Sequence, residues 1–468
     1  MRHGSRRVLS RRSTLWRVGL IALGILSLAG ISPQAFASTQ VVSADRVNCA
    51  SDIAPDAPVR RRIQPAVREA IARGEDETIL ICPGTYFGPV TINDEDADID
   101  FIGVGDKSDI IVRARSGSGG PIFRVLRAEH IGFFNLTVDG MSRMVPANGP
   151  GGVVTGIFFR RTEEATMDGI MVQNIDSRDG NAQGICIHMQ GGNGVDQAFE
   201  IKDNILSNCT RVGVLADGEG VEAEVKRNII VGPLGPHTFA PNGIQVSRGA
   251  EATIYENIID AVESLTPTLG AGSGILAFCA EDAHIEDNII TGTDLGVSVA
   301  DSEEITVLSN DLLGNAFSVL LQTVGFFFGN PNCPNGSHPP TENEISFNNL
   351  LESINVGIDV NTLDPSVGVP ADNEVEGNVM EGQGFFGILV RQGEDNSFED
   401  NLIFDDSSPD IVDQTTGNGT SGTANFYEDN ACTGISIPEG LCDPILTFTN
   451  LATGGEVKSK PLVAVSPY

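Results

Sequence analysis

The chain has few of the residues that bind nucleic acid. Only 29 of its 468 residues are Lys or Arg, against 63 Asp or Glu, and it has one Trp, four Tyr and six His. A net charge of −34 repels nucleic acid, so no nucleic-acid partner is expected. The excess of carboxylates favours divalent cations, and Ca²⁺ is the one cofactor that the composition suggests.

Hydrophobic runs long enough to matter for a membrane are lacking apart from Val18–Ile31. This run follows an Arg-rich start and ends near Ala35-Phe36-Ala37, which is typical of a cleaved export signal. It is short for a membrane span, and the Arg-rich start fits either the general or the twin-arginine route. We therefore expect residues 1–37 to be a signal peptide, no membrane span after its removal, and a protein that is secreted, periplasmic or at the cell surface.

A CxxC pair is also lacking, which argues against a zinc site. Eight Cys in an exported chain instead predict disulfides. Cys432 and Cys442 lie close in a turn-rich segment, and Cys49 and Cys82 bracket an expected helix, so these are the two pairs that we predict. The pairing of the other four residues stays open: Cys186, Cys209, Cys279 and Cys333.

What the sequence does contain is a repeated phrase: an apolar residue, two mostly polar residues and an Asn. Its Asn residues are Asn174, Asn204, Asn228, Asn257, Asn288, Asn310, Asn348, Asn378 and Asn401. A phrase that returns at this period predicts a solenoid, in which each repeat stacks on the next. Asn side chains stacked about 4.8 Å apart would hydrogen-bond to each other and to the turn backbone, so we expect a structural Asn ladder.

A second phrase, Gly-aliphatic-x-aliphatic, alternates with the first. It begins at Gly156, Gly184, Gly213, Gly243, Gly274, Gly296, Gly357 and Gly387. Alternation along a strand puts its two aliphatic residues inward and the residue between them outward.

The N-terminal region adds a recognisable order of elements. Residues 63–72 have apolar residues at helical spacing, and residues 78–86 predict a buried strand that ends in Pro83-Gly84-Thr85-Tyr86. A short helix, this strand and turn, and Asn-bearing repeats resemble the pectin-lyase-like superfamily. The resemblance implies an all-β fold, a right-handed parallel β-helix whose short N-terminal α-helix caps the open end, where apolar core would otherwise be exposed.

On this reading residues 38–95 are the N-terminal cap and first strand, 96–430 the coils, roughly ten to twelve of them, and 431–468 the C-terminal cap and tail. In the resembled superfamily the Gly-aliphatic strand is the first of each coil, and the loops that flank it wall a substrate groove. Most of the long insertions, which are 141–154, 232–242, 262–273, 323–343 and 362–373, would then border one face, as expected of a binding side.

Aligning the coils on the Gly-aliphatic strand places Arg160, His188 and Asp217 on one outward line, about 5 Å apart. They would supply a cation for a carboxylate, a base that titrates near neutral pH, and an acid. We take these three as candidate catalytic residues and Arg248 and His237, which lie nearby, as candidate substrate-binding residues. No metal-ligating set is expected. The competing reading is that a solvent-facing strand carries polar residues without any catalytic role.

The leading hypothesis is an exported protein that binds an acidic or neutral polysaccharide along the first sheet and cleaves it by a lyase-type reaction. Uronate β-elimination needs a cation for the sugar carboxylate and a base for the C5 proton. Hydrolysis is less favoured, because Asp217 has no second carboxylate at the same position on either neighbouring coil. The alternatives are a non-catalytic structural or adhesive β-helix and a helper of a metal centre, which the lack of clustered His or Met disfavours. Whether the protein is an enzyme, and its oligomeric state, stay open.

Overall fold

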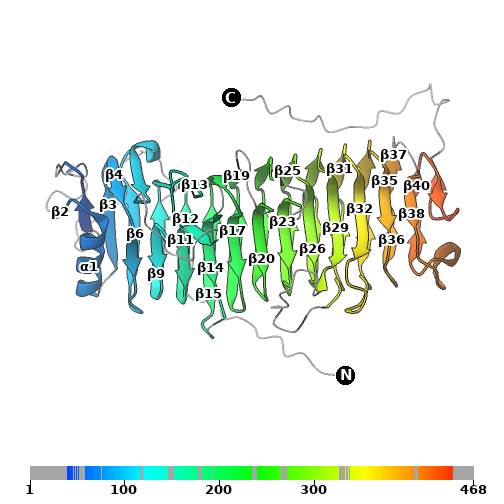
Figure 1. Cartoon of the computed structure of the whole chain (residues 1–468), viewed down its shortest axis with the longest axis horizontal. Helices are drawn as coiled ribbons and strands as arrows, with labels where there is room; N and C mark the ends of the chain where they lie inside the picture. The colour runs from blue at the N-terminus through cyan, green and yellow to red at the C-terminus, as the bar shows by residue number, and fades with distance from the viewer. Residues whose placement is uncertain are drawn as a thin grey trace, which may run out of the picture. The chain divides into compact units, whose positions relative to one another are not determined.

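Short strands fall into three sheets, and the chain visits the sheets in turn (Figure 1). The computed structural model describes residues 39–445 except 46, 48, 50, 52–57, 75, 116–119, 146–151, 178–181, 193, 234–239, 265–270, 326–332, 334–335, 337 and 405–408. These residues belong to one compact unit, Thr39–Tyr468. The expected signal peptide, the second half of the expected C-terminal segment and His237 lie outside the described residues.

Sheet A has 15 strands. In sheet order they are β2 (Val59–Arg60), β1 (Thr39–Val42), β3 (Glu77–Ile81), β6 (Asp98–Gly103), β9 (Ala128–Phe134), β12 (Thr162–Asp168), β15 (Gln197–Lys202), β18 (Val221–Lys226), β21 (Glu251–Tyr255), β24 (Asp282–Glu286), β27 (Ile305–Leu308), β30 (Glu344–Ser346), β33 (Glu374–Glu376), β36 (Ser397–Glu399) and β39 (Phe426–Glu428).

Sheet B has 14 strands. They are β4 (Gly84–Phe87), β7 (Ile110–Arg113), β10 (Thr137–Asp139), β13 (Met171–Ile175), β16 (Ile205–Cys209), β19 (Ile229–Val231), β22 (Ile258–Asp260), β25 (Ile289–Thr291), β28 (Asp311–Leu313), β31 (Asn349–Leu351), β34 (Val379–Glu381), β37 (Leu402–Phe404), β40 (Ala431–Cys432) and β42 (Asp443–Pro444).

Sheet C has 13 strands. They are β5 (Val90–Ile92), β8 (Phe123–Val125), β11 (Val153–Arg160), β14 (Gln183–Gln190), β17 (Val212–Asp217), β20 (Asn242–Ser247), β23 (Ser273–Phe278), β26 (Leu295–Ala300), β29 (Phe317–Thr323), β32 (Val356–Thr362), β35 (Phe386–Val390), β38 (Ile411–Asp413) and β41 (Ser436–Ile437).

Each coil contributes one strand to sheet C, then one to sheet A and one to sheet B, as β14, β15 and β16 do. Each strand pairs in parallel with the equivalent strand of the next coil, for example β14 with β17 and β15 with β18. This is the right-handed parallel β-helix that was predicted. Each sheet has 11 or 12 strands within residues 96–430, in line with the ten to twelve coils that we expected, and further strands lie in the expected N-terminal cap (β1 to β5) and after residue 430 (β40 to β42).

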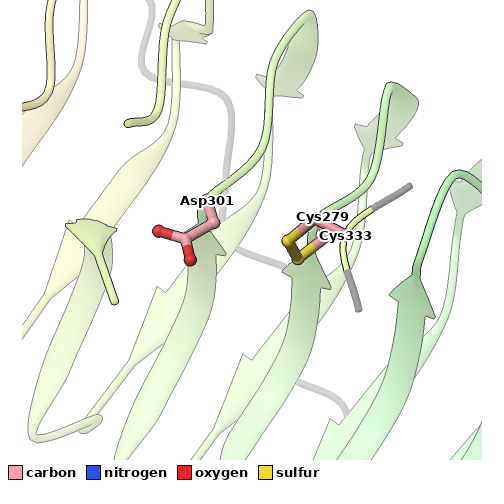
Figure 2. Close-up of side chains that lie close together, drawn as sticks. All are labelled: Cys279, Asp301 and Cys333. Carbon is pink, nitrogen blue, oxygen red and sulfur yellow. A yellow bond between two sulfur atoms is a disulfide. The ribbon is translucent and has the colours of Figure 1, made fainter. Parts of the chain in front are cut away.

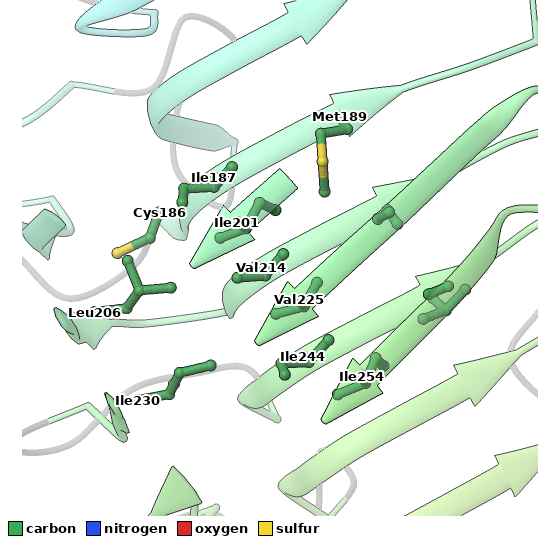
Figure 3. Packing of buried hydrophobic residues seen from close by; sticks show 14 of the residues in the cluster. Cys186, Ile187, Met189, Ile201, Leu206, Val214, Val225, Ile230, Ile244 and Ile254 are labelled. Carbon is green, nitrogen blue, oxygen red and sulfur yellow. The ribbon is translucent and has the colours of Figure 1, made fainter. Parts of the chain in front are cut away.

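The core is built from inward-pointing aliphatic residues that stack from coil to coil (Figure 3). Ile187, Val214 and Ile244 are register partners on sheet C, and Ile201, Val225 and Ile254 are register partners on sheet A. All six are almost completely buried. Burying a side chain of this size contributes about 1.5–3 kcal/mol, so the stacked positions supply most of the stability of each coil.

The predicted N-terminal helix is confirmed as α1 (Ile63–Arg73). It buries Ile63, Ala66, Val67 and Ala70 and packs against β1, β3 and β5. It ends at Gly74, whose φ of 66° is a left-handed conformation that glycine adopts without steric cost. The helix therefore covers apolar residues of the first coil. No helix in the described part of the chain is both long enough and apolar enough to cross a membrane.

Four disulfides tie the coils and caps together. Cys49–Cys82 and Cys432–Cys442, the two predicted pairs, are confirmed. The four residues left open form Cys186–Cys209 and Cys279–Cys333. The second of these joins the long segment after β29 to the end of β23.

The Asn ladder lies at the turn between sheets A and B. Each Asn Nδ2 donates to the Oδ1 of the Asn on the next coil, at 2.9–3.0 Å, along Asn204, Asn228, Asn257, Asn288, Asn310, Asn348, Asn378, Asn401 and Asn430. Asn430 had not been predicted, because Tyr427 stands at the first position of its phrase. Asn174 was predicted wrongly: it lies within β13 and accepts a hydrogen bond from Asn208, and Ile170 takes the ladder position of its coil.

A second ladder, which we had not predicted, lies at the turn that leads into sheet A. Asn343, Asn373, Asn396 and Asn425 are linked in the same way, with Nδ2 to Oδ1 distances of 2.7–2.8 Å. The two ladders together satisfy backbone groups at both turns that flank sheet A in the later coils.

We expect Asn288→Leu to lower the free energy of unfolding by at least about 2 kcal/mol. Asn288 Nδ2 donates to Asn310 Oδ1 and to the carbonyl of Ile254, and its Oδ1 accepts from Asn257, so leucine leaves several buried groups unpaired. Urea unfolding measures the loss. Asn349→Leu is the matched control, because Asn349 is exposed and its side chain donates to Asp311 at the surface. Equal unfolding midpoints for the two variants would contradict a structural ladder.

Candidate functional site

The outer face of sheet C is flanked by the long insertions, as predicted. Insertions 141–154, 232–242 and 262–273 lead into β11, β20 and β23, and insertions 323–343 and 362–373 follow β29 and β32. All five therefore adjoin strands of one sheet. The outer face of sheet C is therefore the candidate binding face.

The register on this face differs from the prediction at His188. His188 pairs with Phe158 and Leu215, whereas Gln190 pairs with both Arg160 and Asp217. The sequence alignment used Gly184, but Cys186 occupies the position that corresponds to Gly213, because Ile185 and Ile187 pair with Val212 and Val214. The outward line is thus Arg160, Gln190 and Asp217, and His188 lies on the neighbouring outward line.

His188 and Asp217 nevertheless meet. The Nε2 of His188 lies 3.6 Å from Oδ2 of Asp217, and both side chains are largely buried, 13% and 6% exposed. That Nε2 has no closer hydrogen-bond partner among the described residues. The ring of His188 also packs edge-on against Phe158, with centroids 5.2 Å apart. The carboxylate and the aromatic ring together orient the imidazole.

Arg248 is the cation that binds Asp217. Its Nε and Nη2 donate to the two carboxylate oxygens, and the Oγ of Ser247 donates to Oδ1 at 3.2 Å. Arg248 follows β20 with a φ of 59°, in the left-handed region, at the turn that ends the strand. Burial raises the pKa of Asp217, but the nearby imidazole of His188 and the hydrogen-bonded guanidinium of Arg248 outweigh burial, so its pKa lies below the ordinary value.

A hollow of about 260 Å³ opens beside this carboxylate. It is lined by Gln190, Gly191, Gly192, Asp217, Gly218, Glu219 and Arg248. Gln190, Glu219 and the glycines were not among the predicted site residues. The run Gly191 to Gly194 was visible in the sequence as a glycine-rich turn, but nothing there linked it to Asp217 on the next coil.

Arg160 lies apart from the hollow. It is exposed, and two strand steps separate it from Asp217, about 10 Å along the sheet. The structure therefore joins Asp217 with His188 and Arg248, and places Arg160 further along the same outer face.

Aromatic side chains adjoin the polar group on both sides. Phe158 contacts His188, and Phe278 is the register partner of Ser247 on the next strand. Both are partly exposed on the outer face. Residues 326–328, which are three Phe in the sequence, lie outside the described residues.

Charge is distributed unevenly between the sheets. The acidic residues in the strands of sheet C are Asp217, Asp359 and Asp413, and all three are buried. In sheet A, by contrast, every strand from β12 to β39 except β27 carries Asp or Glu. Arg124, Arg160, Arg248 and Arg391 are basic residues on or directly after strands of sheet C. The strongly acidic chain thus keeps its exposed strand carboxylates away from this face.

A further group of metal-ligand type lies at the ends of β23 and β26. Cys279, Asp301 and Cys333 bring their side chains close together, and the two sulfur atoms are joined in a disulfide (Figure 2). Asp301 accepts hydrogen bonds from the backbone N–H groups of Val324 and Gly325, at 2.7 and 2.8 Å. Burial raises the pKa of Asp301, and those hydrogen bonds oppose the rise.

Comparisons with known proteins agree with this architecture. The family described as "Periplasmic copper-binding protein (NosD)" matches residues 143–332, less than half of the chain. No curated protein matches. Among solved structures, the catalytic domain of a GH87 α-1,3-glucanase in complex with nigerose is 11% identical, with a TM-score of 0.53, over 86% of this chain and 69% of that one.

The A-modules of two mannuronan C-5 epimerases from Azotobacter vinelandii are also similar. AlgE4 is 18% identical with a TM-score of 0.47 over 80% of this chain and 96% of that one. AlgE6 is 16% identical with a TM-score of 0.45 over 74% of this chain and 94% of that one. At such identities a likeness concerns the fold alone.

The description of the matched family raises the question of copper. Thiolates are the ligands that copper(I) favours, but Cys279 and Cys333 form a disulfide with each other and therefore have no free thiol. Asp301 already accepts two backbone hydrogen bonds. In this oxidised form the group does not fit a copper centre, and we derive no chemistry from it.

The chain is a right-handed parallel β-helix protein, and the NosD family model matches its residues 143–332.

We expect Arg248→Met to lower the free energy of unfolding by about 1–2 kcal/mol near neutral pH. This is less than the cost of breaking a fully buried pair, because Arg248 is 37% exposed. A carboxyl with a lowered pKa contributes stability above its unfolded pKa of about 3.9 and loses it as the pH falls through the folded value. The difference between variant and wild type should therefore shrink on acidification.

Urea unfolding at several pH values makes this measurement. Arg227→Met is the matched control, because Arg227 forms a similar two-point pair with Asp203, but both side chains are exposed. Surface pairs contribute about 0–1 kcal/mol, so the control should lose little at any pH. A loss in Arg248→Met that persists unchanged at low pH would contradict the assigned role of the Asp217 carboxylate.

Proposed function

We propose that the protein is exported and binds a polysaccharide along the outer face of sheet C. The observation that carries the proposal is the hollow beside Asp217, which is lined by a carboxylate, a guanidinium and the amide of Gln190, on a face that also carries the partly exposed Phe158 and Phe278. Planar polar groups bind pairs of hydroxyl or carboxyl oxygens, and aromatic rings pack against the apolar faces of sugars. Export is supported by the signal-like N-terminus, the four disulfides and the periplasmic description of the matched family.

The charge distribution supports an acidic polysaccharide over a neutral one. The strands of sheet C expose arginines and bury their carboxylates, whereas the rest of the chain is strongly acidic. A polyanion would be repelled by sheet A and tolerated on sheet C. Glu219 is the exposed acid in the hollow itself, and a bound Ca²⁺ between it and the ligand would offset that charge.

The cleavage chemistry that the residues fit best is uronate β-elimination. In this reaction a base removes the C5 proton, a C4–C5 double bond forms, and the C4–O bond breaks with its electron pair leaving on the glycosidic oxygen, which then takes a proton. His188, oriented by Asp217, is the proposed base, and Arg248 or Arg160 is the proposed partner of the uronate carboxylate.

A non-catalytic binding protein is the second candidate. It is favoured by the burial of His188, whose side chain is only 13% exposed. The Nε2 of His188 is itself buried and lies against Asp217. On this reading His188 supports Asp217, and the face holds a polysaccharide without cutting it.

An activity assay separates the two candidates. We expect the mature protein, incubated with alginate and with polygalacturonate, with and without Ca²⁺, to release unsaturated products that absorb in the ultraviolet. His188→Ala should then lower the rate by about 10²–10⁴-fold, the usual contribution of a general base. His284→Ala is the control, because His284 pairs with Glu286 on sheet A.

Binding of the same polysaccharides should be followed in parallel by affinity electrophoresis. Binding without product would leave a non-catalytic binding protein. Product formation that His188→Ala leaves unchanged would remove His188 from the reaction. Absence of both binding and product would refute the proposed function.

A further inference from the structure

A second buried carboxylate with an arginine partner lies further along the same face. Asp359 on β32 is 4% exposed, and the Nε of Arg391, directly after β35, donates to its Oδ1 at 3.1 Å. As at Asp217, the arginine comes from the end of the next strand of sheet C and is itself partly exposed. Burial raises the pKa of Asp359, and Arg391 opposes the rise.

The strand pattern gives no packing reason for a carboxylate at this position. The register partners of Asp359 are Leu320 and Leu389, and both are buried on the outer face. A leucine would continue this column, and burying a carboxylate there costs free energy unless it is paired. A buried, paired carboxylate on an outward-facing strand is therefore a candidate for a binding site.

Arg391 is only partly used by the protein. Among the described residues, its one side-chain hydrogen bond is made by Nε, and its side chain is 42% exposed. Arg248, by contrast, uses both Nε and Nη2 on Asp217. The terminal nitrogens of Arg391 are thus available to a ligand while the carboxylate of Asp359 holds the guanidinium in place.

Aromatic rings adjoin this pair as well. Phe317 and Phe386 are both register partners of Val356, on the outward column next to Asp359, and pack with Val356 and Leu389. Phe385, next to Phe386, is exposed. The second pair therefore repeats the combination found at Asp217, a carboxylate–guanidinium pair beside phenylalanine.

One unbroken outward line leads from Asp217 to β32, where it ends at Asn361, two residues after Asp359. It runs from Asp217 through Ser247, Phe278, Ala300 and Gln322 to Asn361, each the register partner of the next. From β17 to β32 there are five strand steps, about 24 Å at about 4.8 Å each (Figure 1). The residues between are small, apolar or uncharged, so the line carries no charge that would repel a chain laid along it.

We propose that Asp359 and Arg391 form a second saccharide subsite, and that one extended acidic polysaccharide binds across both pairs. This inference rests on the proposed function, since it takes the same class of ligand on the same face. It predicts that affinity depends on ligand length, because a chain that reaches both pairs binds the second at high effective concentration.

The experiment measures binding of size-fractionated oligouronates from alginate and polygalacturonate by titration calorimetry, using short oligomers and oligomers longer than the span. For the wild type, long oligomers should bind at least about tenfold more tightly than short ones. Arg391→Met should weaken the long oligomers by about tenfold and leave the short ones unchanged, whereas Arg248→Met should weaken both. Arg227→Met, which removes a comparable arginine away from sheet C, should change neither.

The outcomes distinguish the two proposals. Unchanged binding of short oligomers shows that Arg391→Met is folded, so its loss on long ones is a subsite effect. If wild type binds short and long oligomers equally, or Arg391→Met binds long ones as wild type does, the second subsite is wrong and the proposed function stands. If no oligomer of either length binds to the wild type, both fall.

Discussion

The stacking of buried Asn amides is the interaction on which the rest of this structure depends. In a parallel β-helix every turn must bring the chain back one strand spacing from the preceding coil, and the tight turn between sheets A and B buries its backbone groups. Asn257 shows how the amide meets both demands: its Nδ2 donates to Val225 of one neighbouring coil and to Asn288 of the other. Its own N–H also donates to Asn288 Oδ1. Each Asn therefore links three successive coils, and the register set at this turn extends to the outward positions of sheet C.

The sequence predicts this scaffold well and the details of the site less well, for a physical reason. A ladder needs the same amide at every coil, so its period is visible from Asn204 to Asn401. Asn174 shows the limit: it carries the same phrase, but Ile170 occupies its coil's ladder position and only donates its backbone N–H to Asn204. The repeated phrase shows that an Asn lies near a turn, but it does not show at which of two adjacent turns of the coil that Asn lies.

The error at His188 has the same origin. A glycine marks the strand of sheet C because a Cβ there would approach the next coil closely, as at Gly213, where it would lie 2.5 Å from the carbonyl oxygen of Gly243. In the coil of β14 this position holds Cys186, which points inward and bonds to Cys209. Aligning on Gly184 therefore moved His188 by two residues. The pairing of Arg248 with Asp217 could not be predicted either, because it depends on a left-handed turn at a non-glycine residue.

The two carboxylate–arginine pairs have the same chemistry but differ in how many hydrogen bonds join them. Asp217 accepts hydrogen bonds from Arg248 and Ser247 and lies near His188, so its charge is satisfied within the protein and its pKa is lowered. Asp359 has a single nitrogen of Arg391, and burial keeps its pKa raised. A pair joined by two hydrogen bonds forms a rigid, preorganised end, whereas a pair joined by one hydrogen bond gains more from a ligand that supplies further acceptors. On the proposed binding face, the Asp217–Arg248 pair is thus held in place by the protein itself, whereas a bound acidic chain would add the remaining hydrogen bonds at the Asp359–Arg391 pair.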